Sequence, residues 1–265
     1  PFMVYASEKI QTNDPSASEQ WAFFNDGSFT SEEITKYPVY SDPFGQPSEN
    51  AERLGTLVEV KKRQAVSGVD INLKQAWETY GNGSHDTIVA MIDTGIDASH
   101  EDLKDTLWVN TDEIPGNGID DDGNGYVDDR YGWNFYNNNN QIFNGNEDSH
   151  GTHGAGTISA GTGNGIGIAG IVPGNRVRVM ALKALGGTDG GGSTAAVIKA
   201  IRYAEDNGAV ICNLSLTSTV DDKALYEAMK NSSMLFVVAT GNGNPKTGKG
   251  VDTDAIPFYP AAYDL

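Results

Sequence analysis

Three polar side chains that could do chemistry together stand at the borders of apolar or small-residue segments. Asp93 closes TIVAMID, His150 opens HGTHGAGT, and Asn242 lies in ATGNGN, directly after MLFVVAT. A carboxylate at the end of a buried strand is costly unless it is paired or hydrogen-bonded. An imidazole among small residues can pack closely against a sheet as a positioned base, and an amide held by glycines can donate to a developing oxyanion. The order of the three and their shared placement are more informative than any one alone.

Each residue also has a simpler interpretation. Asp93 could cap the turn that follows it, His150 could be a surface histidine, and Asn242 could belong to an ordinary Asn-Gly turn. A zinc site built from His150 and His153 is not favoured, because an HExxH motif places one more residue between its histidines and requires a glutamate.

The elements that must position these residues alternate between strands and helices. Short apolar runs predict strands at 87–93, 177–185, 209–216 and 234–240. Helical spacing predicts helices at 71–80, 150–160, 193–208 and 221–232. This alternation predicts an α/β fold, a three-layer parallel β-sheet flanked by helices. Ligands of such sheets bind beyond the carboxyl ends of the strands, so we expect the chemistry just after Asp93, Leu216 and Ala239.

With DTGID, HGTHGAGT, NLSL and GNGN in this order, the chain resembles the subtilisin family of serine peptidases over roughly residues 71–265. The resemblance implies a subtilisin-like fold and a serine endopeptidase. Asp93 would orient the imidazole of His150. His150 would take the proton of a serine hydroxyl and pass it to the leaving amine, and Asn242 would stabilise the oxyanion.

The resemblance also implies a protein or peptide substrate that is bound as an extended strand between two backbone segments. The matching residues are Gly190, Gly191 and Gly192 on one side and Leu214, Ser215 and Leu216 on the other. The three glycines could instead form a flexible loop before a helix. Where the family usually continues NLSL with glycine, this chain has Thr217, which could narrow the primary specificity pocket.

An acidic loop, GIDDDGNGYVDD, fits the D-x-D-x-N-G pattern of Ca2+ loops. Five aspartates within ten residues repel one another strongly unless a cation is bound. The expected ligands are Asp120, Asp122, Asn124, the Tyr126 carbonyl and Asp128, with Asp129 in place of the missing bidentate glutamate. The alternative is a solvated acidic loop.

A second Ca2+ site is implied by the resemblance alone. In the family, the loop after the histidine helix offers carbonyls and an asparagine to calcium, helped by an upstream aspartate. These map to Asn164, the carbonyls of Ile166 and Ile168, and Asp102, with Asp14 as a further candidate.

Charge and cysteine content narrow the class of protein. The 265 residues contain 18 Lys and Arg against 36 Asp and Glu, a net charge of −18. Such a surface repels phosphate backbones and anionic lipids, so we expect no nucleic-acid or membrane partner. Cys212 is the single cysteine and lies in an apolar run, which is typical of a buried small hydrophobe. Cation binding and acidity together favour a secreted or extracytoplasmic protein, although no signal peptide is visible.

The chain departs from a complete peptidase in one respect. No G-T-S-M-A nucleophile segment occurs, and Ser193 opens a helix in the wrong surroundings. We therefore expect residues 71–265 to be a C-terminally incomplete catalytic domain, whose remainder supplies the serine, and residues 1–70 to be an irregular N-terminal extension and surface insertion. The alternatives are a non-catalytic relative that acts as a regulatory or binding protein, and a purely structural calcium-binding module.

Overall fold

The computed structural model describes residues 9–40, 53–81, 83, 85–174, 176–243 and 250–265. The chain forms two compact units. The first comprises Pro1–Ile10, Trp21–Gln75 and Asn242–Asp252, and the second comprises Gln11–Gln20, Ala76–Gly241 and Thr253–Leu265.

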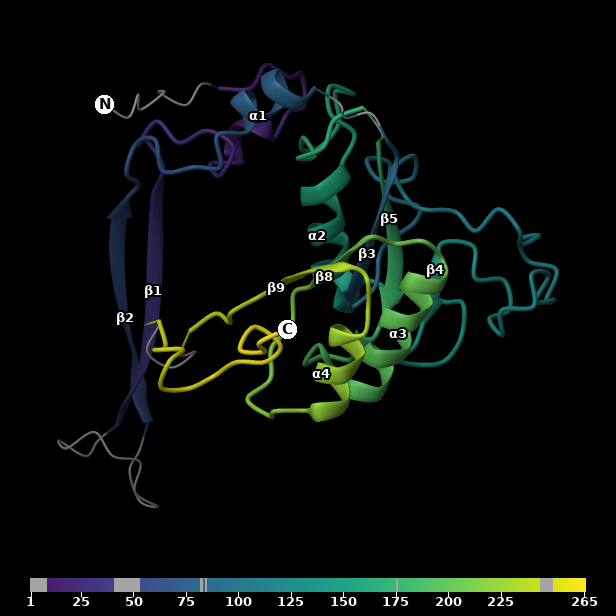
Figure 1. Cartoon of the computed structure of the whole chain (residues 1–265). Helices are drawn as coiled ribbons and strands as arrows, with labels where there is room; N and C mark the ends of the chain where they lie inside the picture. The colour runs from purple at the N-terminus through teal and green to yellow at the C-terminus, as the bar shows by residue number, and fades with distance from the viewer. Residues whose placement is uncertain (1–8, 41–52, 82, 84, 175, 244–249) are drawn as a thin grey trace. The chain divides into compact units, whose positions relative to one another are not determined.

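The second unit is built on a five-stranded parallel sheet in the order β4-β5-β3-β8-β9. The strands are β3 (Thr87–Asp93), β4 (Gly132–Asn134), β5 (Val177–Lys183), β8 (Ile211–Leu214) and β9 (Leu235–Val238). The central strands are almost continuously apolar because helices cover both of their faces, as Figure 1 shows. The predicted parallel sheet flanked by helices is confirmed.

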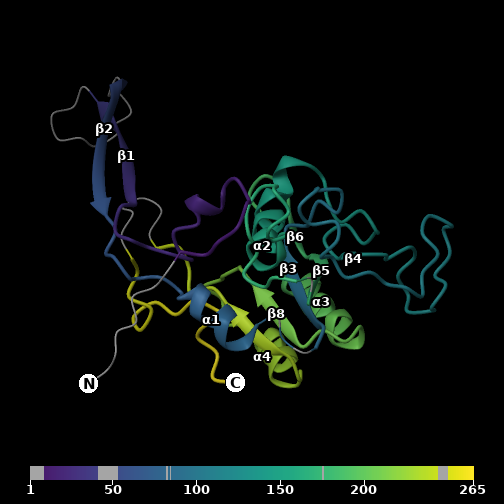
Figure 2. The same ribbon diagram turned by 90° about the horizontal axis from the view of Figure 1, so that it is seen from above.

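The two faces of the sheet have separate cores. Ala90 and Ile92 of β3 pack with Val197 and Ile201 of helix α3 (Thr194–Asp206), and helix α4 (Lys223–Lys230) adds Leu225 to the same cluster. Val89 and Met91 point to the opposite face, where Ala155 of helix α2 (Ser149–Ser159) packs. Figure 1 shows α2 on one side of β3 and β5, and α3 and α4 on the other, and Figure 2 shows the same layers from above. His150 is therefore carried on a different face from the helix that follows the glycine segment.

Capping side chains fix where the helices of the α3–α4 face begin. Ser193 Oγ accepts a hydrogen bond from the Ala196 amide (3.2 Å), and Asp222 accepts from the Ala224 and Leu225 amides (2.9 and 3.3 Å). Ser193 is thus a helix N-cap in this structure. The remaining short elements are helix α1 (Leu73–Tyr80), the 3-10 turns η1 (Ala17–Glu19) and η2 (Asn146–Asp148), and the paired strands β6 (Leu185–Gly186) and β7 (Gly191–Gly192).

The expectation that residues 1–70 are irregular is wrong for part of that range. Strands β1 (Thr30–Tyr40) and β2 (Arg53–Gln64) of the first unit pair in antiparallel register, from Thr30 opposite Gln64 to Tyr40 opposite Arg53. Both segments are rich in β-branched residues and tyrosine or leucine, but charged residues interrupt the apolar pattern. Charged residues that interrupt an apolar pattern do not exclude a hairpin strand, because an antiparallel strand tolerates alternating polar residues.

Cys212 is buried at the centre of β8 and free, and burial raises the pKa of its thiol to about 12, as expected of a small core residue. Among the described residues, no helix is both long and apolar enough to cross a bilayer.

Candidate active site

Asp93 and His150 form a hydrogen-bonded pair at the carboxyl end of β3. The Nδ1 atom of His150 lies 2.8 Å from Asp93 Oδ1 and 3.0 Å from Oδ2, although the two residues are 57 positions apart in the chain. The Asp93 side chain is 1% exposed and the His150 side chain 61% exposed. Because a carboxylate can only accept, the proton of a neutral imidazole sits on Nδ1 and leaves Nε2 as the free acceptor. This arrangement suits a general base that is oriented by a buried acid.

Backbone contacts bring the start of α2 against the turn that follows Asp93. The Asp93 carboxylate accepts from the Thr94 amide (2.7 Å), and the Thr94 hydroxyl accepts from the Gly151 amide (3.1 Å). A Cβ atom at Gly151 would lie 2.2 Å from the Gly95 carbonyl oxygen, so no other residue fits there. The glycine that follows His150 is therefore required by this close approach.

A cleft of about 620 Å3 adjoins the pair, lined by Thr94 and His150 together with the predicted substrate segments. Of those segments, Gly190, Gly191, Gly192, Ser215 and Leu216 line the cleft. Leu214 does not, because its side chain is fully buried in the α3–α4 core and its carbonyl accepts from the Ala239 amide. Thr217 also lines the cleft.

The glycine segment has defined structure. Gly191 and Gly192 form β7, which pairs with β6 through Gly186 and Leu185. A Cβ atom at Gly192 would come within 2.4 Å of the Ala184 carbonyl oxygen, so glycine is needed for packing at this position. These contacts favour a fixed edge beside the cleft over a flexible loop.

Asn242 follows β9 along the chain and stands between Gly241 and Gly243, both with positive φ. It is assigned to the first compact unit. Its place beside the Asp93–His150 pair therefore stays a prediction.

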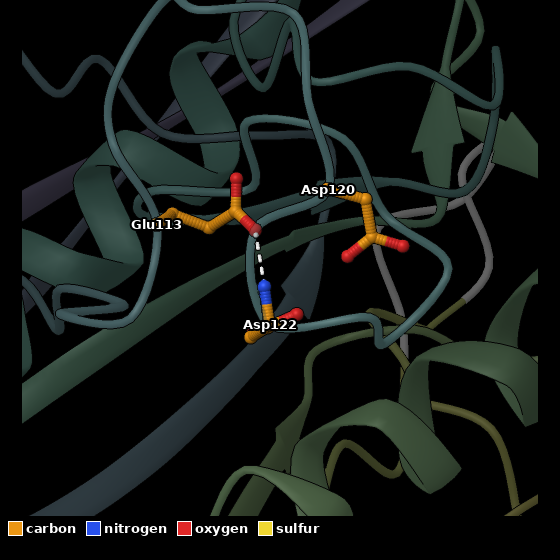
Figure 3. Close-up of side chains that lie close together, drawn as sticks. All are labelled: Glu113, Asp120 and Asp122. Atoms are coloured by element: carbon orange, nitrogen blue, oxygen red, sulfur yellow. Dashed lines mark hydrogen bonds between the residues drawn. The ribbon is translucent and has the colours of Figure 1, made fainter.

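The acidic loop gathers three carboxylates whose oxygens lie within 4.8 Å of one another, from Glu113, Asp120 and Asp122. Figure 3 shows the three side chains and the contact from the Asp122 amide to Glu113, at 3.4 Å. Glu113 is 5% exposed and also accepts from the Asp121 and Asp128 amides (2.8 and 3.0 Å). The acidic loop motif lacks the bidentate glutamate of Ca2+ loops. Glu113, which precedes the motif in the sequence, adds a glutamate carboxylate to the cluster.

The other predicted ligands of this loop are engaged in different ways. Asp128 accepts from the Gly116, Asn117 and Gly118 amides and so lies toward that turn. Asn124 donates to Asp122 and to Asp129, both at 3.0 Å. The Tyr126 ring packs edge-on against Trp133, Phe135 and Tyr203. The predicted ligand is the Tyr126 carbonyl, which these ring contacts do not involve.

The second predicted calcium loop is also assembled around carboxylates. Asp102 accepts from the Asn164 side-chain amide (2.8 Å) and from the Ile168 amide (3.3 Å). The Ile166 amide donates to Asn164 Oδ1 (2.8 Å). The structure thus brings these four predicted residues together.

Asp14 reaches the same loop from far away in sequence. It accepts from the Gly163, Asn164 and Gly165 amides at 2.8, 3.0 and 3.1 Å. Burial works to raise the pKa of the Asp14 carboxyl, but these donors and the Thr12 hydroxyl outweigh it and hold the pKa below its ordinary value.

Sequence reasoning missed three buried ionisable residues around these sites. Glu113 precedes the acidic motif and carried no signal of its own. Lys183 and Asp148 form an ion pair with both side chains 1% exposed, next to the Asp93–His150 pair. A lysine inside an apolar strand and an aspartate two residues before His150 were visible in the sequence, and an unpaired charge at either position would be costly.

Comparison with known proteins gives one consistent result. The model of the subtilase family matches residues 84–264. The chain is 36% identical over 179 residues to the major intracellular serine protease of Bacillus subtilis, covering 66% of this chain and 48% of that protein. It is 32% identical to thermitase of Thermoactinomyces vulgaris, covering 73% and 57%, and 36% identical to subtilisin-like protease 1 of Plasmodium berghei, covering 61% and 27%. The chain thus spans between 27% and 57% of the length of these relatives.

Proposed function

Because this chain belongs to the subtilase family, we propose that its protein is a serine endopeptidase that hydrolyses peptide bonds through an Asp-His-Ser triad. The observation that carries the proposal is the 2.8 Å contact between the exposed imidazole of His150 and the buried carboxylate of Asp93, beside a cleft. Similarity to the major intracellular serine protease of Bacillus subtilis and to thermitase also supports this proposal.

In this mechanism His150 Nε2 takes the proton of a serine hydroxyl as the oxygen attacks the scissile carbonyl carbon. The resulting tetrahedral intermediate breaks its carbon–nitrogen bond while His150 returns the proton to the leaving amine, and water then releases the acyl group by the same steps. Asp93 stays ionised and stabilises the imidazolium. The G-T-S-M-A segment that carries this serine in the family does not occur among residues 1–265.

Asn242 would donate from its side-chain amide to the oxyanion of the intermediate. In subtilisin itself, loss of one such donor lowers kcat by about 10²- to 10³-fold. The proposal assigns the same role here on the basis of the GNGN motif after β9.

Substrate would bind as an extended strand between the Gly190–Gly192 edge and Ser215 and Leu216, the part of the second predicted segment that lines the cleft. Main-chain hydrogen bonds would supply affinity, and side-chain pockets would supply selectivity. The cleft and the fixed glycine edge support this placement.

We also propose that the acidic loop and the Asn164 loop hold Ca2+. Clustered carboxylate, amide and carbonyl oxygens form the donor set that this cation takes, and both loops contain it. Glu113, Asp120 and Asp122 would hold the first ion, and Asp102, Asn164 and the Ile166 and Ile168 carbonyls the second. Bound Ca2+ would neutralise carboxylate repulsion and so stabilise the fold.

Secretion remains a proposal that rests on acidity and expected Ca2+ binding. The name of the Bacillus subtilis relative describes an intracellular protease, so membership of the family does not by itself predict secretion. Immunoblotting of culture medium and cell lysate from the source organism distinguishes them.

Labelling with a fluorophosphonate tests the enzyme proposal against a non-catalytic relative. The full-length protein should be labelled on a serine, and a His150→Ala variant should be labelled far more slowly at equal folded fraction. A folded protein that resists labelling would favour the regulatory or binding role.

A further inference from the structure

We infer that Lys183 is a positioning residue for the Asp93–His150 pair, acting through Asp148 and the turn at Thr94. Lys183 closes β5 directly beside Asp93, its register partner on β3. The inference rests on the proposed function, since it concerns the geometry of that same catalytic pair.

The Lys183 ammonium contacts three separate segments of the site. It donates to Asp148 Oδ1 (2.6 Å), to the Leu185 carbonyl (3.0 Å) and to the carbonyl of Thr94. An ammonium has three donors, so each of them is used. The Tyr136 ring lies 5.6 Å from the same nitrogen.

Each contact fixes a different part of the catalytic geometry. Thr94 is the residue whose amide holds the Asp93 carboxylate. Asp148 immediately precedes α2, the helix that carries His150, and its second oxygen accepts from the Asn144 amide (2.6 Å). One cation therefore joins the segment that carries the acid to the segment that carries the base.

The third contact, to Leu185, reaches the glycine edge, but that edge has other support. Leu185 and Gly186 pair with Gly192 and Gly191, and the Ala184 amide donates to the Asp93 carbonyl. Loss of the Lys183 ammonium should therefore displace His150 relative to Asp93 more than it displaces the substrate edge.

A buried ion pair is a poor device for stability alone. Replacing both partners by well-packed apolar residues is often neutral or stabilising, whereas removing one partner leaves an uncompensated charge. With both side chains 1% exposed, the pair pays the full cost of desolvation. Its three directed hydrogen bonds define orientation in a way that apolar packing cannot, which is why we assign it to positioning.

The test compares Lys183→Met/Asp148→Leu with the wild type in the full-length protein. The double variant removes both charges, so its stability in urea should be close to that of the wild type. Its kcat should fall about 100-fold with KM unchanged, because a shift of about 1 Å in a catalytic group costs that much. The NMR signal of the His150 Nδ1 proton should move or broaden.

The matched control is Arg176→Met/Asp86→Leu, which removes a 3.0 Å ion pair that is 46% and 68% exposed. It should leave kcat, KM and the His150 signal unchanged. If the Lys183 double variant fails to fold, the decision passes to Lys183→Met/Asp148→Asn, which also leaves no unpaired charge and keeps the size of the Asp148 side chain. A lower kcat at wild-type melting temperature supports positioning.

A folded variant with wild-type kcat and an unchanged His150 signal overturns the inference. Failure of this inference can be told apart from failure of the proposed function. If His150→Ala abolishes hydrolysis while the charge-free variant works normally, only the role of Lys183 is lost. If the wild type shows no hydrolysis, the positioning role is decided by comparing the NMR signal of the His150 Nδ1 proton between the wild type and the double variant.

Discussion

The Tyr203 hydroxyl donates a 2.5 Å hydrogen bond to Asp129, a carboxylate with no exposed surface. Tyr203 belongs to α3, and Asp129 ends the acidic loop, so this contact anchors the loop to the helical layer. Asn110 donates to the other Asp129 oxygen at 2.8 Å. Burial, followed by the contact with Asp129, raises the pKa of Tyr203 far above its ordinary value, so the phenol remains protonated. These contacts tie Asp129, one of the predicted Ca2+ ligands, to α3 and to Asn110.

Tyr203→Phe should destabilise the fold. It removes a hydrogen bond to a buried charge, which is worth about 1.5–3 kcal/mol, while the Asn110 and Asn124 donors to Asp129 remain. Urea unfolding measures the change in free energy. Tyr226→Phe is the control, because that hydroxyl bonds an exposed carbonyl. Equal losses in the two variants would contradict a special role for the Asp129 contact.

Removing calcium should lower the free energy of unfolding. A ligand bound only by the folded state at about 100 times its Kd contributes about 2.7 kcal/mol. Glu113→Gln should reduce this contribution, since one carboxylate of the Glu113, Asp120 and Asp122 cluster is lost. Urea unfolding with and without chelator provides the measurement, and Asp105→Asn is a charge-matched control at an exposed position. A chelator effect that is absent, or untouched by Glu113→Gln, would speak against Ca2+ in this loop.

Acid should remove the stabilisation that Asp14 provides. Its folded pKa lies below the ordinary value of 3.8, so its contribution is complete well above that value and is lost as pH falls through the folded pKa. Asp14→Asn should therefore be less stable than the wild type at neutral pH, with a gap that closes in acid. Denaturant unfolding across pH, in chelator, checks this. If the difference in stability between the wild type and Asp14→Asn grew as the pH fell, the assigned role of the Asp14 carboxylate would be wrong.

Thr217→Gly should broaden the side chains accepted in the cleft, since Thr217 lines it where a glycine is usual in the family. We expect kcat/KM to rise about 10-fold for peptides with large side chains at the residue that precedes the scissile bond, relative to those with small ones. Thr188→Gly, at an exposed position also lining the cleft, is the control. An unchanged ratio would exclude Thr217 from the primary pocket.

The sheet and the Asp93–His150 pair were predictable because their signals are local. Asp93 ends an apolar run, His150 lies among small residues, and strand ends of a parallel sheet meet at one edge. The bounds of β3 match the apolar run at 87–93, whereas the sequence pattern does not predict the strand order β4-β5-β3-β8-β9.

Other features depend on contacts that no local pattern encodes. Glu113 lies in the acidic cluster because the chain between it and Asp120 turns back on itself. Strand β4, which pairs with β5, lies in a segment whose sequence is typical of a polar loop. Lys183 lies in an apolar run, and its burial depends on an ion pair with Asp148, which is 35 positions away in the chain. The β1–β2 hairpin was missed because charged residues interrupt both strands.

The most direct test of the account is the peptidase activity of Asp93→Asn in the full-length protein. The asparagine keeps the shape of the side chain but favours the wrong imidazole tautomer, so kcat should fall about 10⁴-fold while the protein remains folded. If Asp93→Asn hydrolyses peptides at the wild-type rate, the Asp93–His150 contact does not drive catalysis, and the central assignment is wrong.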